Sequence, residues 1–192
     1  MRMELNWLNS IVNVAEFKDK ANVIFYYAGH GVPDEATRET YLLPIDGVGN
    51  MVSSGYKLSE LYAALDSMPA KRVTVFMDAC FSGSARGEGM LAAARGVKIK
   101  PKAEQAKENR VVFSAASGDE TAYPYKAKGH GLFTYYLIKK LKESKGECTY
   151  GELSTYIHDN VLKDAMLENG KSQTSTVSAI GDAWKNERFI NY

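Results

Sequence analysis

Two short segments of the sequence carry side chains that can perform acyl transfer. The segment YYAGHG ends at Gly31 and holds His30 between two glycines, and the segment DACFSG begins at Asp78 and holds Cys80. In this chemistry a thiolate attacks a carbonyl carbon, and an imidazole moves the proton to the leaving amine. Glycines let the backbone pass close to a substrate, so the amides of Gly31 and Cys80 are candidates to bind the developing oxyanion.

Each segment directly follows an apolar run that predicts a buried strand. Val23 to Tyr27 precedes His30, and Val73 to Met77 precedes Cys80. Both runs are short and rich in β-branched or aromatic residues, as buried strands are. The functional crevice of an open parallel sheet lies beyond the carboxyl ends of its strands. We therefore expect His30 and Cys80 just past the ends of their strands, at the same edge of the sheet.

Amphipathic stripes at helical spacing alternate with the expected strands. The stripes comprise Leu5, Leu8 and Val12; Leu58, Leu61, Tyr62, Leu65 and Met68; Leu132, Phe133, Tyr136, Leu137 and Leu141; and Leu153, Ile157 and Val161. Thr149 and Glu152 form a capping box that opens the last of these helices, and Val111 to Ala115 predicts a third strand. This alternation predicts an α/β fold with a mainly parallel sheet covered on both faces.

Composition limits the class of protein. A chain of 192 residues with 45% hydrophobic content is long enough for one buried core, and its net charge of +1 predicts no nucleic-acid or membrane partner. Apolar runs stay below the roughly 18 to 20 residues of a membrane span, and Met1 to Ile11 is too polar for a signal peptide. Two cysteines, Cys80 and Cys148, are too few to stabilise a domain of this size by disulfides, which favours a reducing compartment such as the cytoplasm. They also lack metal-ligand spacing, which predicts no metal site.

Together with three further segments, the two reactive segments resemble the caspase-like cysteine peptidases of clan CD. A histidine about fifty residues before the cysteine is a caspase signature. DACFSG is similar to the D-x-C-x-S-G pattern of the metacaspase and bacterial caspase-like branch. YLLPIDG at 41–47, VVFSAASGDETAY at 111–123 and GHGLFTYYLIKKL at 129–141 follow in family order. The resemblance therefore covers most of the chain.

The resemblance implies a caspase-like three-layer α/β/α sandwich with a mainly parallel sheet. We expect one peptidase domain over residues 1–192. Within it, 1–85 would correspond to the large subunit, 86–109 to a basic inter-subunit loop, and 110–192 to the small subunit. His30 would then be the general acid and base, and Cys80 the nucleophile.

The resemblance also implies a substrate pocket for the residue before the cleaved bond, the S1 pocket. In metacaspases the aspartate two positions before the cysteine lines an acidic S1 pocket that receives arginine or lysine, which places Asp78 in that role. A carboxylate there pairs with a guanidinium or ammonium group. Ala28 and Ser114 stand where other pocket-lining residues would fall. The alternative for Asp78 is that it caps the turn after its strand.

The basic loop is a candidate for self-cleavage. It contains the candidate sites Arg86, Arg95, Lys98, Lys100 and Lys102. A long connection inside a compact domain tends to be functional or disordered, and a lysine-rich loop also serves solubility alone. We therefore expect protein or peptide substrates with a basic residue at P1, with this loop as one such substrate.

Two alternatives to hydrolysis stay open. In the first, the chain is a catalytically silent caspase-like domain that serves interaction or scaffolding, or a truncated fragment. This alternative arises because the family fold begins with a strand and helix upstream of this sequence. Without that strand, the run Val23 to Tyr27 has an exposed hydrophobic edge, and we expect self-association through it. The same dyad could also ligate peptides instead of hydrolysing them.

Several other residues with chemical potential have simpler expected roles. Many metacaspases need calcium, and Asp34, Glu35 and Asp46 lie in the corresponding region, but they lack the regular spacing of an oxygen-ligand loop. We therefore predict no metal or other cofactor, with calcium activation as the alternative. His130, His158 and Cys148 are expected to be structural or, for the histidines, to face solvent.

Overall fold

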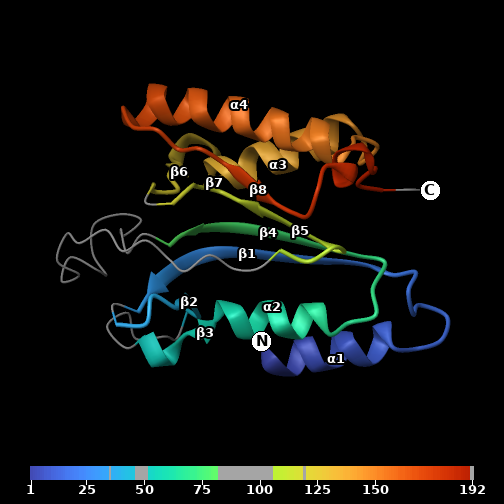
Figure 1. Cartoon of the computed structure of the whole chain (residues 1–192). Coiled ribbons are helices and arrows are strands. Elements are labelled where there is room, and N and C mark those ends of the chain that lie inside the picture. Colours follow the sequence, from blue (N-terminus) through green and yellow to red (C-terminus); the bar gives the residue numbers. More distant parts are fainter. Residues whose placement is uncertain (35, 46–51, 82–105, 119, 191–192) are drawn as a thin grey trace.

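The protein is a sandwich of helices on both faces of a central sheet, as Figure 1 shows for the computed structural model. The structure describes residues 1–34, 36–45, 52–81, 106–118 and 120–190. Helices α1 (Arg2–Val12) and α2 (Leu58–Asp66) cover one face of the sheet, and α3 (Leu132–Glu143) and α4 (Tyr150–Asn169) cover the other. The predicted α/β sandwich is confirmed.

Within the described residues, six strands form the central sheet in the order β3-β2-β1-β4-β5-β8. Their bounds are β1 Asn22–Pro33, β2 Thr40–Leu43, β3 Tyr56–Lys57, β4 Arg72–Cys80, β5 Arg110–Ser114 and β8 Thr176–Ser178. The neighbours β1, β4 and β5 run parallel, whereas β2, β3 and β8 join antiparallel. A small second sheet pairs β6 (Pro124–Tyr125) with β7 (His130–Gly131). Short 3-10 helices span Val52–Ser54, Lys126–Lys128 and Ala183–Asn186.

The three expected strands lie in β1, β4 and β5, but the first two extend further than their apolar runs. Strand β1 continues to Pro33 because β2 adds an antiparallel neighbour along His30 to Pro33. Strand β4 continues to Cys80 because it pairs with β1 along its whole length. The expectation that His30 and Cys80 follow their strands is therefore wrong: both are the last residues of the paired segment.

Alternating side chains of β4 build two separate cores. Val73, Val75, Met77 and Ala79 pack on the side of α1 and α2, in the cluster that contains Leu61. Phe76 and Cys80 pack on the side of α3 and α4. On this second face, the Thr74 hydroxyl lies 2.6 Å from the Tyr150 hydroxyl of α4. Burial on both faces explains why the strand is almost continuously apolar.

The capping box at the start of α4 is confirmed. The Glu152 amide donates to Thr149 Oγ1 at 3.1 Å, and the Thr149 amide donates to Glu152 Oε2 at 2.9 Å. The helix ends at Gly170, which adopts the left-handed conformation with φ of 63°. Within the described ranges, no helix combines the length and the apolar character needed to cross a bilayer.

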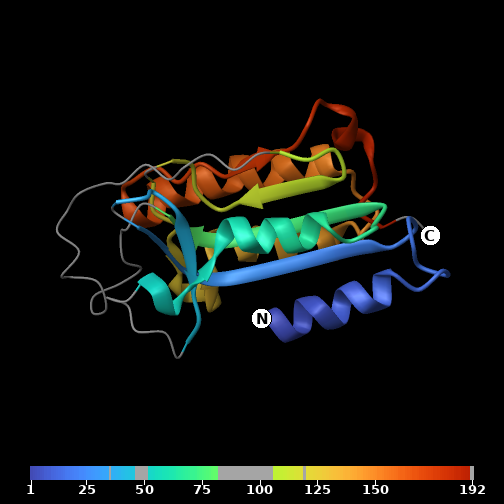
Figure 2. The same ribbon diagram turned by 60° about the horizontal axis from the view of Figure 1, so that its bottom comes forward.

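Strand β1 has an edge that the described part of the sheet covers incompletely. It pairs with β4 along Asn22 to His30, whereas its register with β2 runs from His30 to Pro33. Helix α1 lies with α2 on one side of the sheet in Figure 1, and in Figure 2 it runs alongside β1, with α2 on the other side of this strand in that view. Leu5 and Val12 of α1 belong to the same core cluster as Val23 of β1, so the helix packs on a face of the strand. On the opposite face Ile24 is 53% exposed.

Self-association through residues 23–27 stays a prediction. We expect the protein to form dimers or larger species at high concentration, measured by light scattering, and Ile24→Lys to shift them to monomer because a charge on an edge strand opposes pairing. Ile45→Lys, at a fully exposed position after β2, is the control and should leave association unchanged. A wild-type protein that stays a monodisperse monomer at high concentration contradicts the prediction.

Candidate active site

The pairing of β1 with β4 brings the predicted catalytic residues side by side. His30 and Cys80 are partners in the parallel register, and two residues earlier Ala28 and Asp78 are partners as well. Side chains alternate along a strand, so all four point to the face covered by α3 and α4, where Phe76 and Cys80 also pack. The Cys80 side chain is 4% exposed, whereas His30 is half-buried.

The glycines around His30 make room for two aromatic rings. Tyr27 Oη lies 2.9 Å from the carbonyl oxygens of both His30 and Leu43, which ties the end of β1 to β2. A Cβ at Gly29 would lie 2.6 Å from Tyr27 Oη. A Cβ at Gly31 would overlap the Phe81 ring and lie 2.7 Å from the Cys80 carbonyl oxygen. The bare backbone is therefore a packing requirement at both positions.

The Cys80 sulfur contacts the main chain of the segment that follows β5. The Ala122 amide donates to Cys80 Sγ at 2.8 Å, and the thiol donates to the Ala122 carbonyl at 3.5 Å. Ala122 is itself fully buried. The thiol is thus covered in this structure, and a substrate carbonyl reaches it only when this cover shifts.

Asp78 holds the beginning of α3. Its Oδ2 accepts from Thr134 Oγ1 at 2.5 Å and from the Thr134 amide at 3.3 Å, and Thr134 is the third residue of the helix. The Tyr26 hydroxyl lies 2.7 Å from Thr134 Oγ1 on the other side. A Cβ at Gly131 would run into the Asp78 carboxylate. The carboxylate therefore satisfies amide and hydroxyl groups at a helix N-terminus rather than the turn after its own strand.

A cavity of about 390 Å³ opens beside Asp78 and Ala28. The remaining wall comes from Tyr26 and Thr134 and from the β6–β7 hairpin, which contributes Lys126 and His130. Asp78 is 1% exposed, whereas Lys126 and His130 are exposed.

Ser114, the third residue expected in the pocket, is not among the residues that line this cavity. Ser114 directly follows Phe113 on β5, and Phe113 packs in the core on the side of α3 and α4. Because side chains alternate along a strand, Ser114 points to the opposite face of the sheet. The described geometry brings Asp78 and Ala28 together and leaves Ser114 apart from them.

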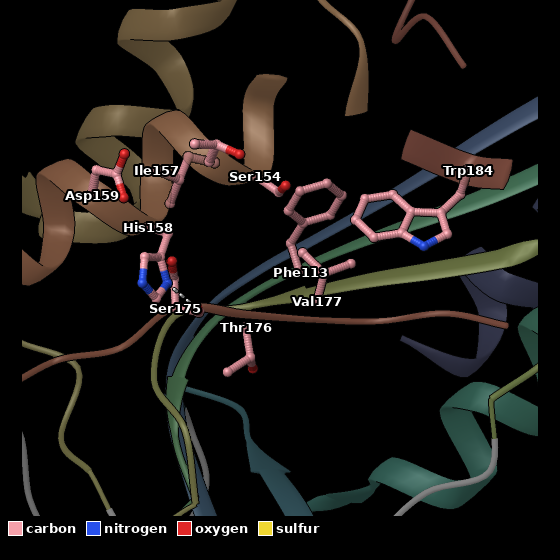
Figure 3. A pocket seen from close by; sticks show the side chains of 10 residues that line it. Phe113, Ser154, Ile157, His158, Asp159, Ser175, Thr176, Val177 and Trp184 are labelled. Atoms are coloured by element: carbon pink, nitrogen blue, oxygen red, sulfur yellow. Dashed lines mark hydrogen bonds between the residues drawn. The ribbon is translucent and has the colours of Figure 1, made fainter. Parts of the chain in front are cut away.

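A second cavity of about 250 Å³ lies between α4 and β8 (Figure 3). Phe113 and Trp184 form its aromatic part, and His158 stands at its other end. His158 Nδ1 lies 3.1 Å from the Ser175 carbonyl oxygen, which holds the imidazole between α4 and the strand. This contact agrees with the structural role expected for His158.

Two other residues with expected structural roles differ in their surroundings. Cys148 is 3% exposed and packs in the core under α3 and α4. His130 is exposed, but it also lines the cavity beside Asp78. The sequence offered no signal for this placement, because the hairpin that carries His130 folds back on β4 only in the tertiary structure.

The acidic region considered for calcium is partly described. Asp34 Oδ1 accepts from the Thr37 amide at 2.7 Å, the Thr37 hydroxyl at 2.8 Å and the Ala36 amide at 3.1 Å. The hydrogen bonds from Thr37 hold the pKa of Asp34 below its usual value, and the bond from the amide has a larger effect than the bond from the hydroxyl. Glu35 and Asp46 lie outside the described residues. Among those described, no three His, Cys, Asp or Glu side chains are grouped as metal ligands would be.

Two polar residues missed by sequence reasoning hold the segment that covers Cys80. Gln173 is fully buried, its Nε2 donates to the Ala115 carbonyl at 2.9 Å, and its Oε1 accepts from the Tyr123 amide at 2.7 Å. Glu120 accepts from the Thr174 amide at 2.7 Å, besides hydroxyl donors on both segments. Ala115, Glu120 and Tyr123 are therefore attached to residues 172–174.

The ionisation of Glu120 reflects these contacts. Burial opposes the charged form, but the hydrogen bonds from Thr174 and from the hydroxyls of Ser117 and Ser172 outweigh it, so the pKa of Glu120 lies below its usual 4.5.

Comparisons with known proteins agree with this architecture. The family model described as "Caspase domain" matches residues 1–181. The chain belongs to the caspase-domain family. This family consists of cysteine peptidases, and the resemblance drawn from the two reactive segments is confirmed at this level. No curated protein sequence matches the chain.

Solved structures show that the caspase fold extends over nearly the whole chain. Caspase-1 from Spodoptera frugiperda is similar with a TM-score of 0.60 at 14% identity, over 93% of this chain and 67% of the other. The protein GSU0716 from Geobacter sulfurreducens is similar with a TM-score of 0.60 at 17% identity, over 97% of this chain and 76% of the other. At these identities the likeness concerns the fold alone.

The crowding at Gly31 predicts a sensitive position in this caspase domain. We expect Gly31→Ala to lower the free energy of unfolding by about 1 to 3 kcal/mol, because neither the Phe81 ring nor the Cys80 carbonyl leaves space for a methyl group. Urea unfolding followed by tryptophan fluorescence measures this change. Adding Phe81→Ala should recover only part of the Gly31→Ala loss, since the backbone contact persists. A Gly31→Ala protein as stable as wild type contradicts the packing argument.

The lowered pKa of Glu120 predicts a pH-dependent contribution to stability. A depressed folded-state pKa stabilises the protein above the unfolded value near 4.5, and this contribution is lost as the pH falls through the folded value. We expect Glu120→Gln to be less stable than wild type near neutral pH and the difference to shrink in acid. Urea unfolding between about pH 7 and about pH 3 tests this, with the exposed Glu16→Gln as control. A difference that stays constant with pH contradicts the assignment.

Proposed function

We propose that the protein is a cysteine endopeptidase with Cys80 as the nucleophile and His30 as the general acid and base. The observation that carries this proposal is the register of β1 and β4, which pairs His30 with Cys80 on one face of a caspase-fold sheet. Adjacent strands of a sheet lie about 4.8 Å apart, so the side chains of paired residues on the same face are neighbours. In the proposed reaction this imidazole and thiol exchange a proton once the thiol is uncovered. The family and the pairing support the proposal together.

The proposed reaction proceeds through a thioester. The Cys80 thiol gives its proton to His30, and the sulfur attacks the substrate carbonyl carbon to form a tetrahedral intermediate. Collapse of the intermediate breaks the C–N bond, and His30 passes the proton to the leaving amine. Water then attacks the thioester with His30 as base, which releases the carboxylic acid and restores the thiol.

The amides of Gly31 and Cys80 are the proposed donors to the oxyanion. Cys80 is the last residue of β4 in the β1–β4 pair, and Gly31 directly follows its partner His30 and pairs with Leu42 of β2. The absence of a Cβ at Gly31 allows its backbone to lie against the Cys80 carbonyl. Fixed amide donors stabilise charge that develops on the carbonyl oxygen during attack.

We further propose that the cavity beside Asp78 is the S1 pocket and prefers arginine or lysine. The charge buried in its wall is the Asp78 carboxylate, and Ala28 leaves space beside it. The bonds from Thr134 hold this carboxylate in the wall of the cavity. Lys126 at the exposed mouth opposes a basic side chain less than Asp78 attracts it, because solvent and salt screen exposed charges.

Self-processing in the basic loop is part of the same proposal. The candidate sites Arg86, Arg95, Lys98, Lys100 and Lys102 all lie outside the described residues. Their basic side chains match the specificity proposed for the Asp78 pocket.

One observation favours the second candidate, a catalytically silent domain that binds partners. The Cys80 thiol is 4% exposed and hydrogen-bonded to Ala122, so a substrate cannot reach it without a rearrangement of residues 115–123. A silent domain needs no such rearrangement. The two candidates therefore differ in whether a folded protein turns over any peptide.

Hydrolysis of a small peptide panel with Arg, Lys, Asp or Asn at P1 tests the proposal. We expect cleavage after Arg and Lys that is abolished in Cys80→Ala and retained in Cys148→Ala. His30→Ala should lower kcat/KM by about 10²- to 10⁴-fold, the usual contribution of a general acid and base. The intact mass of wild type, but not of Cys80→Ala, should show cleavage after residues of the basic loop. The panel is measured with and without added calcium.

The other outcomes of this experiment are equally informative. Cleavage only after Asp retains the peptidase and overturns the role of Asp78 in the S1 pocket. Absence of cleavage by protein with a cooperative unfolding transition favours the silent domain. Transpeptidation products in place of free acids assign the dyad to ligation.

A further inference from the structure

The main-chain amide of Ala122 is a hydrogen-bond donor to the sulfur of Cys80. It lies 2.8 Å from Sγ, whereas the Ala122 carbonyl that accepts from the thiol is 3.5 Å away. Both residues are buried, with Cys80 4% and Ala122 0% exposed. When the thiol loses its proton, its bond to the carbonyl disappears, but the bond from the amide remains and gains strength from the charge.

Gln173 fixes the position of this amide. Its side chain spans the segment 115–123, with Nε2 bound to the Ala115 carbonyl at 2.9 Å and Oε1 bound to the Tyr123 amide at 2.7 Å. Tyr123 directly follows Ala122, so the second bond holds the residue next to the donor. Gln173 is 0% exposed, and a buried amide that keeps its partners satisfied rigidifies its surroundings.

Glu120 adds a second attachment of the same segment. It accepts from Ser117 Oγ at 2.9 Å within the segment and from the Thr174 amide at 2.7 Å outside it. Ser172 Oγ reaches Glu120 Oε1 at 3.0 Å from the exposed side. The segment that carries Ala122 is therefore hydrogen-bonded at several points to residues 172–174, and these bonds hold the Ala122 amide beside the sulfur.

We infer that the Ala122 amide stabilises the thiolate of Cys80 and that Gln173 is the positioning residue that keeps this donor in place. The inference rests on the proposed function in one respect: the proposed peptidase uses the thiolate as its nucleophile. An amide held at the sulfur favours the charged form that attacks a carbonyl. Gln173 acts through the Tyr123 amide, which belongs to the residue next to the donor.

The titratable groups on the elements beside Cys80 also influence its protonation. Among the described residues they include His30 on β1, Asp78 on β4, and Glu120 and Tyr123 on the covering segment. A substitution of Gln173 by an uncharged residue changes none of these charges. A change in thiol titration in such a variant therefore reports on the hydrogen-bonded segment.

The test measures the rate of alkylation of Cys80 by iodoacetamide as a function of pH, resolved by mass spectrometry of peptides. The thiolate displaces iodide in this reaction, so the midpoint of the profile reports thiolate formation. We expect Gln173→Met, which has a similar volume but cannot form either bond, to raise the midpoint by about one pH unit. Ser10→Ala, which removes an exposed hydroxyl of α1 on the opposite face of the sheet, should leave the midpoint unchanged.

Two results would overturn the inference. If Cys80 in Gln173→Met is alkylated faster at every pH but with an unchanged midpoint, Gln173 only limits access of the reagent to the thiol. An unchanged profile means that the position of the amide does not depend on Gln173. Cys148, which is 3% exposed, reports unfolding in each sample because it reacts only when the core opens.

A second measurement applies if Gln173→Met does not fold. Hydrogen exchange of the Ala122 amide in wild type is compared with that in Cys80→Ala. Faster exchange in the variant supports the bond from the amide to the sulfur, and equal exchange overturns it. Neither measurement requires peptide hydrolysis, so the inference and the proposed peptidase function can fail separately.

Discussion

The parallel pairing of β1 with β4 is the constraint on which the rest of the structure depends. Strand β4 is buried on both faces, so its register with β1 is set by two cores at once. A slip by one residue would move every side chain of a strand to the other face. The same register that buries Val75 and Phe76 therefore aligns His30 with Cys80 and Ala28 with Asp78. Hydrophobic burial along the strands positions the polar residues at their ends.

The polar residues at these strand ends are held by groups from distant parts of the chain. Asp78 is nearly inaccessible and accepts hydrogen bonds from Thr134, and Gln173 is fully buried and satisfied by main-chain groups. A buried polar group without partners costs a large part of the stability of a domain, so such networks define one arrangement. The carboxylate beside the candidate pocket thus also anchors the helix that covers it.

The same networks create a tension between stability and reactivity. The segment that carries Ala122 packs over the Cys80 thiol, which protects the sulfur but also blocks a substrate. Its attachment through Glu120 and Gln173 joins it to the residues that follow α4. In the proposed peptidase, the Ala122 amide favours the thiolate while the site is empty, and the same residue has to move from the sulfur before a substrate carbonyl reaches it.

The sequence by itself determined the fold class and indicated His30 and Cys80 as the candidate catalytic pair. Apolar runs and helical stripes are local patterns, and a thiol and an imidazole after two such runs indicate acyl transfer wherever parallel strands are neighbours. The glycines beside His30 were also visible, although the need for them was not. That need arises from Tyr27 and Phe81, whose rings lie over Gly29 and Gly31 in the folded protein.

Only the tertiary structure decided how far the strands extend and which residues surround the sulfur. Strand β1 reaches Pro33 because β2 supplies an antiparallel partner, which no local pattern shows. Ser114 faces away from Asp78 because side chains alternate along β5, and packing places its neighbour Phe113 on the face of the sheet to which Asp78 points. Gln173 reaches Tyr123 across fifty residues of sequence. Such contacts depend on how α4 returns the chain to the sheet, and the physical reason is that long-range packing, unlike periodicity, leaves no local trace in the sequence.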